Sequence, residues 1–289
     1  MGKNTHVAVG NAADISDIIT NITPKVTPFL SACPKTKATA TKHQWLEDSL
    51  KEPGANAEVE GFTYDPKDPD PRKELDNVAQ IFQNGYGVTK TQEAVLKHGV
   101  KSEIGYQMAK AAKEHARDIE WALLRNATKD PATETTPRKL GGVQAFVTSN
   151  VIPAAGALTE GLLNDALQAA WAEGGNPTVA YLSGAQKRVV SSFSGEGDKY
   201  LDQNAKKLRQ SISVYESDFG ILSFTPHRMM PDDQVYVIDP DYWKVAQLRP
   251  AHRENLPNSS DMHRKLIVSE LTLEARAEKA SARITGLTV

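Results

Sequence analysis

The stretch from Thr23 to Ser49 constrains the fold more than any other part of the sequence, because it offers no way to bury itself against its own neighbours. It begins like a helix and is interrupted at Pro24 and Pro28, each of which lacks a backbone N–H. From Lys37 onward the side chains alternate as in a strand, but neither face is clearly apolar. The pattern therefore favours an exposed two-stranded ribbon over a strand in the core of a sheet.

We expect the second strand of this ribbon between Asn77 and Thr91. Alternate positions there carry apolar or aromatic side chains, namely Val78, Phe82, Tyr86 and Val88. The intervening residues 51–74 are rich in proline, glycine and aspartate, which is typical of loops. The sequence thus predicts a long hairpin with a broad polar tip. A lone ribbon of this kind is not stable in water, so it requires a partner surface.

The residues before the ribbon predict a short amphipathic arm. Asp14 suits the N-cap of a helix with one narrow apolar stripe, and Pro24 ends that helix. The stripe consists of Ile15, Ile18, Ile19 and Ile22. Thr27 and Pro28 then begin another turn as N-cap and first helical residue. Helices this short are marginal alone, so the isoleucines must pack on the rest of this chain or on another copy.

The strongest helix signal extends from about Ser102 to Asn126. Ser102 is a suitable N-cap, and the acidic Glu103 complements the helix dipole in the first turn. The seam recurs at alternating four- and three-residue steps, at Ile104, Met108, Ala111, His115, Ile119 and Ala122. Such a helix is about 37 Å long and predicts the backbone of a flat or elongated domain.

A second region begins near Gly141 and has the pattern of a compact α+β domain. Thr159 and Ser183 are expected to cap two helices, with a buried strand at 178–182 between them. Further strands are predicted at 211–217, 220–226, 234–240 and 243–249. The alternating C-terminal segment 265–289 is expected to rejoin the sheet of the first region. The coarse prediction is an α+β chain in which a compact domain is inserted between two parts of an elongated one.

Composition excludes several classes of protein. The net charge is −2, from 34 basic and 36 acidic residues, so neither a basic nucleic-acid groove nor an acidic tail is indicated. Cys33 is the single cysteine, which excludes an internal disulfide framework and favours a buried structural thiol. No apolar run reaches the roughly 18 residues of a membrane span, and no signal-peptide pattern is visible. We expect an intracellular protein.

The sequence offers little that would support catalysis. His115 with Asp118, and His252 and His263 near acidic residues, are weak metal patterns, better explained as surface or seam residues. Prolines interrupt the aspartates at 65, 68 and 70, which excludes the alternating ligands of a calcium loop. No phosphate-binding loop and no nucleophile elbow occur. We predict no catalytic residue, cofactor or metal.

Several short motifs in fixed order suggest a family. The segment before the ribbon contains Asp17-Ile18, Asn21-Ile22, Pro24 and Thr27–Ser31, and the ribbon contains His43, Trp45 and Asp48–Leu50. Further matches are Gln80–Phe82, Thr91-Gln92, Tyr106-Gln107, Arg117–Leu124 and Arg138–Gly142. With these motifs the chain resembles the major capsid proteins of tailed bacteriophages, which have the Hong Kong-97-type capsid fold. The resemblance covers most of residues 14–150 and, more loosely, the remainder.

The resemblance implies names and roles for the parts. Residues 1–36 would be the N-terminal arm, 37–91 the extended β-hairpin loop, 92–141 the peripheral domain with its long spine helix, 142–255 the axial domain, and 256–289 C-terminal strands that return to the peripheral domain. The arm and the extended loop would clamp one subunit onto the next. The residues expected at these inter-subunit contacts are Ile15, Ile18, Ile19, Ile22, Phe29, Leu30, Trp45, Phe62 and Tyr64.

The function implied is that of a non-enzymatic shell protein of the virion. Copies of the chain would form pentamers and hexamers of an icosahedral capsid, assembled in the host cytoplasm around double-stranded DNA bound without sequence specificity. We expect no room for a cleaved scaffolding segment, so the resemblance implies a separate scaffolding protein. A portal and a decoration protein are the further partners implied, and no membrane is. Two alternatives remain: an encapsulin-like compartment that encloses cargo enzyme, and an enzyme with an interaction arm.

Overall fold

The computed structural model describes residues 27–50, 53–63, 71–97, 99–193, 213–257 and 260–288. Within these residues the chain forms two compact units. The first unit contains Gln83–Ala116 and His252–Val268, and the second unit contains Val26–Phe82, Arg117–Ala251 and Ser269–Val289. The predicted long helix is confirmed as α3 (Glu103–Arg125), which has residues in both units. No helix in the described ranges is long and apolar enough to cross a membrane.

The predicted hairpin exists, but its return strand was predicted in the wrong place. The strand β2 (Lys42–Glu47) pairs antiparallel with β3 (Lys73–Val78), so that Trp45 lies opposite Leu75. Most of the segment 77–91 instead forms β4 (Gln80–Thr89), whose side chains Phe82 and Val88 are buried. The physical reason is side-chain polarity. A strand with alternating buried apolar residues is stable in a covered sheet, whereas the polar β2 pairs with the equally polar β3.

A four-stranded sheet has the order β1-β10-β11-β4. It joins β1 (Lys35–Lys37) in parallel to β10 (Trp243–Asn255), followed by β11 (Met262–Ala275) and β4. In this respect the C-terminal segment does rejoin strands of the first region, as expected. In the sequence, the short helix α1 (Pro28–Ala32) precedes β1 and α2 (Lys90–Ala94) follows β4, whereas the short helix α4 (Val143–Phe146) follows α3.

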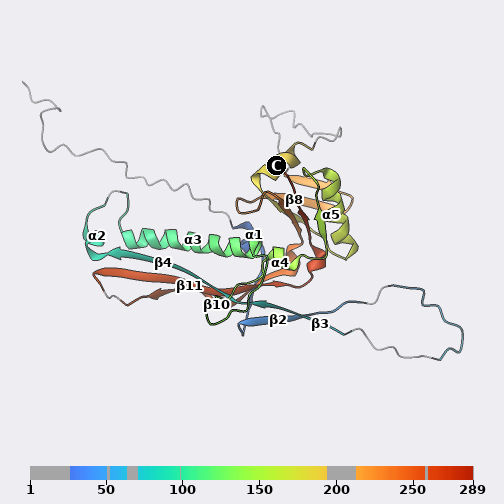
Figure 1. Ribbon diagram of the computed structural model, residues 1–289, viewed down its shortest axis with the longest axis horizontal. Helices are drawn as coiled ribbons and strands as arrows, with labels where there is room; N and C mark the ends of the chain where they lie inside the picture. Colours follow the sequence, from blue (N-terminus) through green and yellow to red (C-terminus); the bar gives the residue numbers. More distant parts are fainter. Residues whose placement is uncertain are drawn as a thin grey trace, which may run out of the picture. The chain divides into compact units, whose positions relative to one another are not determined.

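The second unit contains a six-stranded sheet of order β5-β12-β9-β6-β8-β7, beside which α5 lies (Figure 1). Its strands and helices are β5 (Val151–Pro153), α5 (Glu160–Ala172), β6 (Val179–Leu182), α6 (Gly184–Ser191), β7 (Val214–Ser217), β8 (Gly220–Pro226), β9 (Gln234–Ile238) and β12 (Ala282–Thr285). The predicted caps are confirmed, because the Thr159 and Ser183 side chains accept hydrogen bonds from the amides of Leu162 and Gln186. Two single-turn 3₁₀ helices, η1 (Pro240–Tyr242) and η2 (Glu278–Ala280), complete the elements.

The last strand corrects the prediction for the C-terminus. β12 pairs antiparallel with β9 and parallel with β5, so it belongs to the six-stranded sheet and not to the sheet of the first region. The reason is that Ala282 and Ile284 complete an apolar layer with Leu163 and Leu167 of α5. An exposed position in the other sheet would leave these side chains in water.

The core of the second unit consists of two apolar clusters on opposite faces of this sheet. Along β9, Tyr236 and Ile238 belong to one cluster, and Val235 and Val237 belong to the other. Alternate residues of a strand point to opposite faces, so β9 is buried on both sides, which explains its continuous apolar sequence. The first cluster also contains residues of α3 and α1, and this brings the beginning of the described chain into the core.

Candidate assembly surfaces and their anchors

The short helix α1 is anchored by a buried carboxylate from α3. The backbone amides of Phe29 and Leu30 donate to the two oxygens of Glu120, at 2.8 and 2.7 Å. Thr27, the N-cap residue, makes no side-chain capping bond, so Glu120 satisfies first-turn amides that the helix itself leaves without acceptors. The Glu120 side chain is fully buried. A carboxylate in such a place is stable only when donors surround it.

His227 supplies a further donor to Glu120. Its Nε2 lies 2.9 Å from a Glu120 oxygen, while its Nδ1 accepts from the backbone amide of Met229 at 3.0 Å. Because Nδ1 accepts, the network places the imidazole proton on Nε2, which donates to the carboxylate. The contact is therefore a hydrogen bond in which the imidazole Nε2 donates and a Glu120 oxygen accepts. It ties α1 and α3 to the segment that follows β8.

The Phe29 ring, which was predicted at an inter-subunit contact, is buried in its own chain. It is 1% exposed and packs edge-on against Tyr181 and Trp243, with ring centroids 5.7 and 6.2 Å apart. Cys33 at the end of α1 is buried as predicted, and burial together with the Glu120 charge raises the pKa of its thiol to about 12. The first-turn amides of α1 and the Phe29 ring therefore both have partners within the chain. We call this short buried helix the α1 plug.

The base of the β2–β3 hairpin is fixed to the end of β11. The Trp45 Nε1 donates to the carbonyl oxygen of Ala275 at 2.8 Å, and its ring lies 5.8 Å from that of Phe146. His43 lies 3.2 Å from Glu274, which also accepts from Arg276 at 2.7 Å. Burial raises the pKa of the Glu274 carboxyl, but the hydrogen bonds and charges of Arg276 and His43 outweigh burial, and the net result is a lowered pKa.

Beyond this base the hairpin exposes apolar side chains. Leu46, Leu50, Val59 and Phe62 are 63%, 98%, 76% and 54% exposed. Sequence reasoning identified Phe62 but missed the other three, because Leu46 falls on the more polar face of the alternation and Leu50 and Val59 lie among turn residues. These four residues are named here the hairpin patch. A polar tip was expected, and an apolar component was found.

The remaining predicted contact residues divide into two groups. Leu30 and Trp45 are partly buried against the core of their own chain, so any inter-subunit role for them stays a prediction. Tyr64 and the four isoleucines of the arm, Ile15, Ile18, Ile19 and Ile22, lie outside the described residues.

Two asparagines that sequence reasoning missed hold the hairpin and α3 to the segment 140–142. Asn77 donates to the carbonyls of Gly141 and Leu273, at 2.9 and 2.7 Å, and accepts from the amides of Val78 and Gly141. Asn126 donates to the carbonyl of Leu140 at 2.9 Å. A Cβ at Gly142 would lie 2.5 Å from the Leu123 carbonyl oxygen, so this close approach requires glycine. The one available signal for Asn77 was a polar residue beside the apolar Val78.

The described residues contain no group of three or more histidine, cysteine or acidic side chains that could hold a metal ion. Two of the histidines considered as metal ligands in the sequence have other contacts. His115 is buried and its Nδ1 lies 2.7 Å from Asn84 Oδ1, whereas His252 lies 2.9 Å from Glu254 at the surface. Asp261 forms an ion pair with Lys90 at 3.1 Å. What this geometry can do is anchor and present surfaces.

Comparison with known proteins decides what those surfaces belong to. A sequence profile described as SU10 major capsid protein matches residues 2–288, nearly the whole chain. The chain belongs to the SU10 major capsid protein family. A curated relative, the major capsid protein of Escherichia phage Phieco32, is 24% identical over 335 residues, covering 94% of this chain and 93% of the relative.

Solved structures show the same fold. The cyanophage A-1(L) capsid matches with a TM-score of 0.73 at 12% identity, and the match covers 99% of both chains. The capsid of the native GTA particle matches with a TM-score of 0.69 at 9% identity and covers 98% of both chains. The mixed helix and sheet fold is therefore that of phage capsid proteins. The predicted function is confirmed: this is a major capsid protein of a tailed phage, and it forms the capsid shell.

Proposed function

We propose that this capsid protein assembles into pentamers and hexamers of an icosahedral shell that encloses double-stranded DNA, and that the β2–β3 hairpin clamps neighbouring subunits together. The observation that carries the proposal is the hairpin patch, of which Leu50 is 98% exposed. Several exposed apolar side chains along one hairpin suggest a surface that another protein covers. In a shell made of many copies of one chain, that protein is another copy.

The subdomains of the Hong Kong-97-type fold provide names for the parts. In this proposal residues 1–36 are the N-terminal arm, 37–91 the extended loop, 92–141 the peripheral domain and 142–255 the axial domain. The final residues 256–289 divide between two of these parts, because β11 pairs in the four-stranded sheet and β12 in the six-stranded sheet. The axial domain as proposed therefore also includes Ala282–Thr285.

The clamp is supported by the way the hairpin is held. Trp45 and His43 attach the base of the hairpin to Ala275 and Glu274, so the hairpin is fixed to β11 of the same subunit. A hairpin without that attachment would lose much of its contact energy to ordering on binding. The net charge of −2 fits a shell that surrounds DNA without binding any sequence. A separate scaffolding protein, a portal and a decoration protein are the further partners we propose, with assembly in the host cytoplasm.

Sedimentation and negative-stain microscopy of the purified chain test the proposal. We expect closed shells, or rings of five and six subunits, with nuclease-protected DNA in particles recovered from infected cells. Particles filled with a protein cargo would instead support an encapsulin-like compartment. A chain that stays monomeric with and without a scaffolding protein would contradict the proposal.

The arm is tested by a deletion whose end point the structure sets. Removal of residues 1–30 would take away the Phe29 and Leu30 amides that surround Glu120, and the loss of folding would hide any effect on assembly. Removal of residues 1–26 leaves the α1 plug in place. We expect the shorter deletion to keep the melting temperature of the body and to abolish closed shells. Normal shells would contradict a role for the arm.

A further inference from the structure

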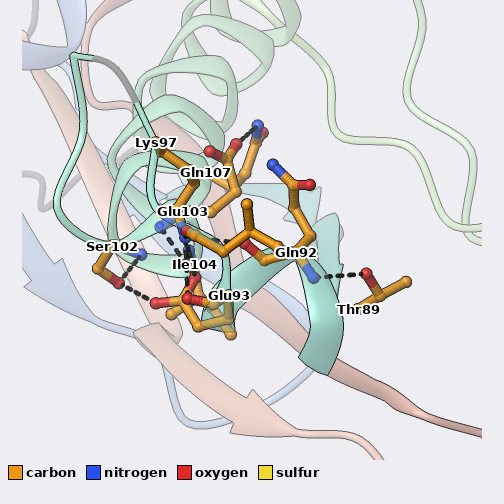
Figure 2. A network of polar contacts seen from close by, with 10 residues as sticks. Thr89, Gln92, Glu93, Lys97, Ser102, Glu103, Ile104 and Gln107 are labelled. Atoms are coloured by element: carbon orange, nitrogen blue, oxygen red, sulfur yellow. Dashed lines mark hydrogen bonds and ion pairs between the residues drawn. The ribbon is translucent and has the colours of Figure 1, made fainter. Parts of the chain in front are cut away.

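The connection between α2 and α3 is held by an unusual concentration of hydrogen bonds, drawn in Figure 2. The Glu93 carboxylate accepts from the Ser102 hydroxyl at 2.7 Å and from the amides of Glu103 and Ile104 at 2.9 and 3.2 Å. These amides belong to the first turn of α3 and have no acceptor within the helix. One side chain of α2 therefore fixes the start of α3. These contacts lower the pKa of Glu93, the Ser102 hydrogen bond being the largest cause.

Lys97 fixes the other side of the same connection. Its ammonium donates to the carbonyl oxygens of Gln92, Glu93 and Val95, at 2.8, 2.9 and 3.2 Å. An ammonium group has three donors, and here all three have acceptors. The Lys97 side chain is only 8% exposed, although it lies in a surface loop. Figure 2 shows it folded back over α2 toward Glu93, 3.8 Å away.

The loop so fixed presents apolar side chains to water. Leu96 is 96% exposed and its neighbour Val95 is 53% exposed. Both residues take part in lining an open depression of about 580 Å³, whose other lining residues are 93, 94, 97 and 99–101. We name these residues, 93–97 and 99–101, the knuckle. A fully exposed leucine on a loop that is already ordered is favourable for binding, since little conformational entropy is lost when a partner covers it.

We propose that the knuckle is a contact between copies of this chain, in which Leu96 of one copy enters the depression on the knuckle of another. The inference rests on the proposed function, because it requires a shell of identical subunits. Identical surfaces that meet around a symmetry axis must be complementary to themselves. The knuckle meets that condition, since it carries a protruding leucine and a depression on the same few residues.

Charge favours the same occupant. When two copies of one surface approach, every unpaired charge faces its own like. Within the knuckle Glu93 and Lys97 pair with each other, and that leaves the exposed Lys101 as the cation most able to oppose contact. A partner of strongly opposite charge would find little to attract it there. A second copy fits better, because among the described residues it meets a surface with little net charge and exposed apolar side chains.

The proposal assigns separate roles to three residues. Leu96 is the contact residue, and Glu93 and Lys97 are positioning residues that hold its loop against α2 and α3. Leu96 contributes little to the fold of the isolated subunit because it is almost entirely in water. Substitution at this position therefore tests the contact without a confounding loss of folding.

The first test is chemical cross-linking in assembled shells. Leu96→Cys introduces an exposed thiol into a chain whose natural Cys33 is buried. With a short bis-maleimide we expect covalent dimers or higher multimers from the shells, and at least tenfold less from Lys113→Cys, an exposed position on α3. Leu96→Cys shells that take up the reagent and remain monomeric would overturn the inference and leave the proposed function standing. A parent chain that forms no shells would overturn both.

The second test measures the need for the apolar side chain. Leu96→Asp places a carboxylate where the leucine of each copy would meet another surface, and we expect at least a tenfold lower yield of closed shells. The matched variant Leu96→Met should keep the parent yield, because methionine preserves apolar volume. Both variants should melt within about 1 °C of the parent as isolated subunits, since the position is exposed. Equal shell yields from Leu96→Asp and the parent would overturn the inference.

Discussion

The α1 plug and the hairpin patch begin from the same physical difficulty and resolve it differently. Neither belongs to an element long enough to be stable alone in water. The plug has its partners inside the subunit. Glu120 accepts hydrogen bonds from the backbone amides of the plug, and the Phe29 ring packs against Tyr181 and Trp243. In the described part of the hairpin, the attachments to the rest of the subunit lie at its base, and the side chains of the hairpin patch remain in water. The difference distinguishes a surface that folds the subunit from one that, in our proposal, joins subunits.

The largest expected difference in stability is between two phenylalanine-to-alanine substitutions, one in the α1 plug and one in the hairpin patch. Phe29→Ala removes a ring that is 1% exposed and should lower the free energy of unfolding of the isolated subunit by about 3–5 kcal/mol. Phe62→Ala removes a ring that is 54% exposed and should change it by less than about 0.5 kcal/mol. Urea unfolding of the two variants measures the contrast. Similar losses of stability would erase the distinction between plug and patch.

A somewhat smaller effect is expected at the carboxylate that holds the plug. Glu120→Gln keeps the size of the side chain but turns an N–H toward amides that themselves donate, and we expect a loss of about 2–4 kcal/mol. Glu114→Gln is the control on the same helix, because the Glu114 side chain is 44% exposed and pairs with Lys110 across one helical turn at 3.8 Å. Its expected change is below about 0.5 kcal/mol. If both variants unfold at the same urea concentration, the plug does not depend on Glu120.

A substitution at the base of the hairpin should cause an intermediate loss of stability. Trp45→Phe keeps a ring beside Phe146 but removes the hydrogen bond to the Ala275 carbonyl, at an expected cost of about 1–2 kcal/mol. Because the base positions the hairpin patch, the yield of shells should fall as well. Sedimentation of the variant beside the parent measures that yield. A variant with lower stability and unchanged assembly would show that the hairpin acts without a fixed base.

The smallest expected effect is a dependence on pH at the same base. The pKa of Glu274 is lowered in the folded chain, so its contacts stabilise the fold above the unfolded value of about 4.5, and that stabilisation is lost as the pH falls through the folded pKa. The free energies of unfolding of the parent and of Glu274→Gln should therefore differ most at pH 6, and the difference should shrink as the pH falls below the unfolded pKa. A difference that does not change over this pH range would mean that ionised Glu274 contributes nothing to the attachment.

Much of the fold follows from local patterns in the sequence. The helix α3 and the capped starts of α5 and α6 were predicted from periodicity and from Ser and Thr at the N-caps, because these signals depend on residues close together in the chain. The return strand of the hairpin and the position of β12 were not predicted correctly, because strand pairing depends on which apolar layer a strand completes. That layer is formed by residues far away in the sequence, such as Leu163 for Ile284.

The candidate site was less accessible to sequence reasoning than the fold. Glu120 lies within a run of helix-forming residues, and nothing local indicates that it caps a helix 90 residues earlier in the chain. Phe29 was predicted at a contact between subunits, whereas its ring is buried in the core of its own chain. Lys97 resembles any surface lysine until its three carbonyl acceptors are seen. In each case the role is set by contacts across the fold, which periodicity does not contain.

The most direct test of the account compares how accessible the hairpin patch is in free subunits and in shells. In Phe62→Cys the new thiol lies in the patch, while the natural Cys33 stays buried. The account predicts rapid alkylation in dissociated subunits and at least tenfold slower alkylation in closed shells, because another copy covers the patch. Equal rates in both states would show that the hairpin patch remains in water, and would contradict the claim that subunits meet there.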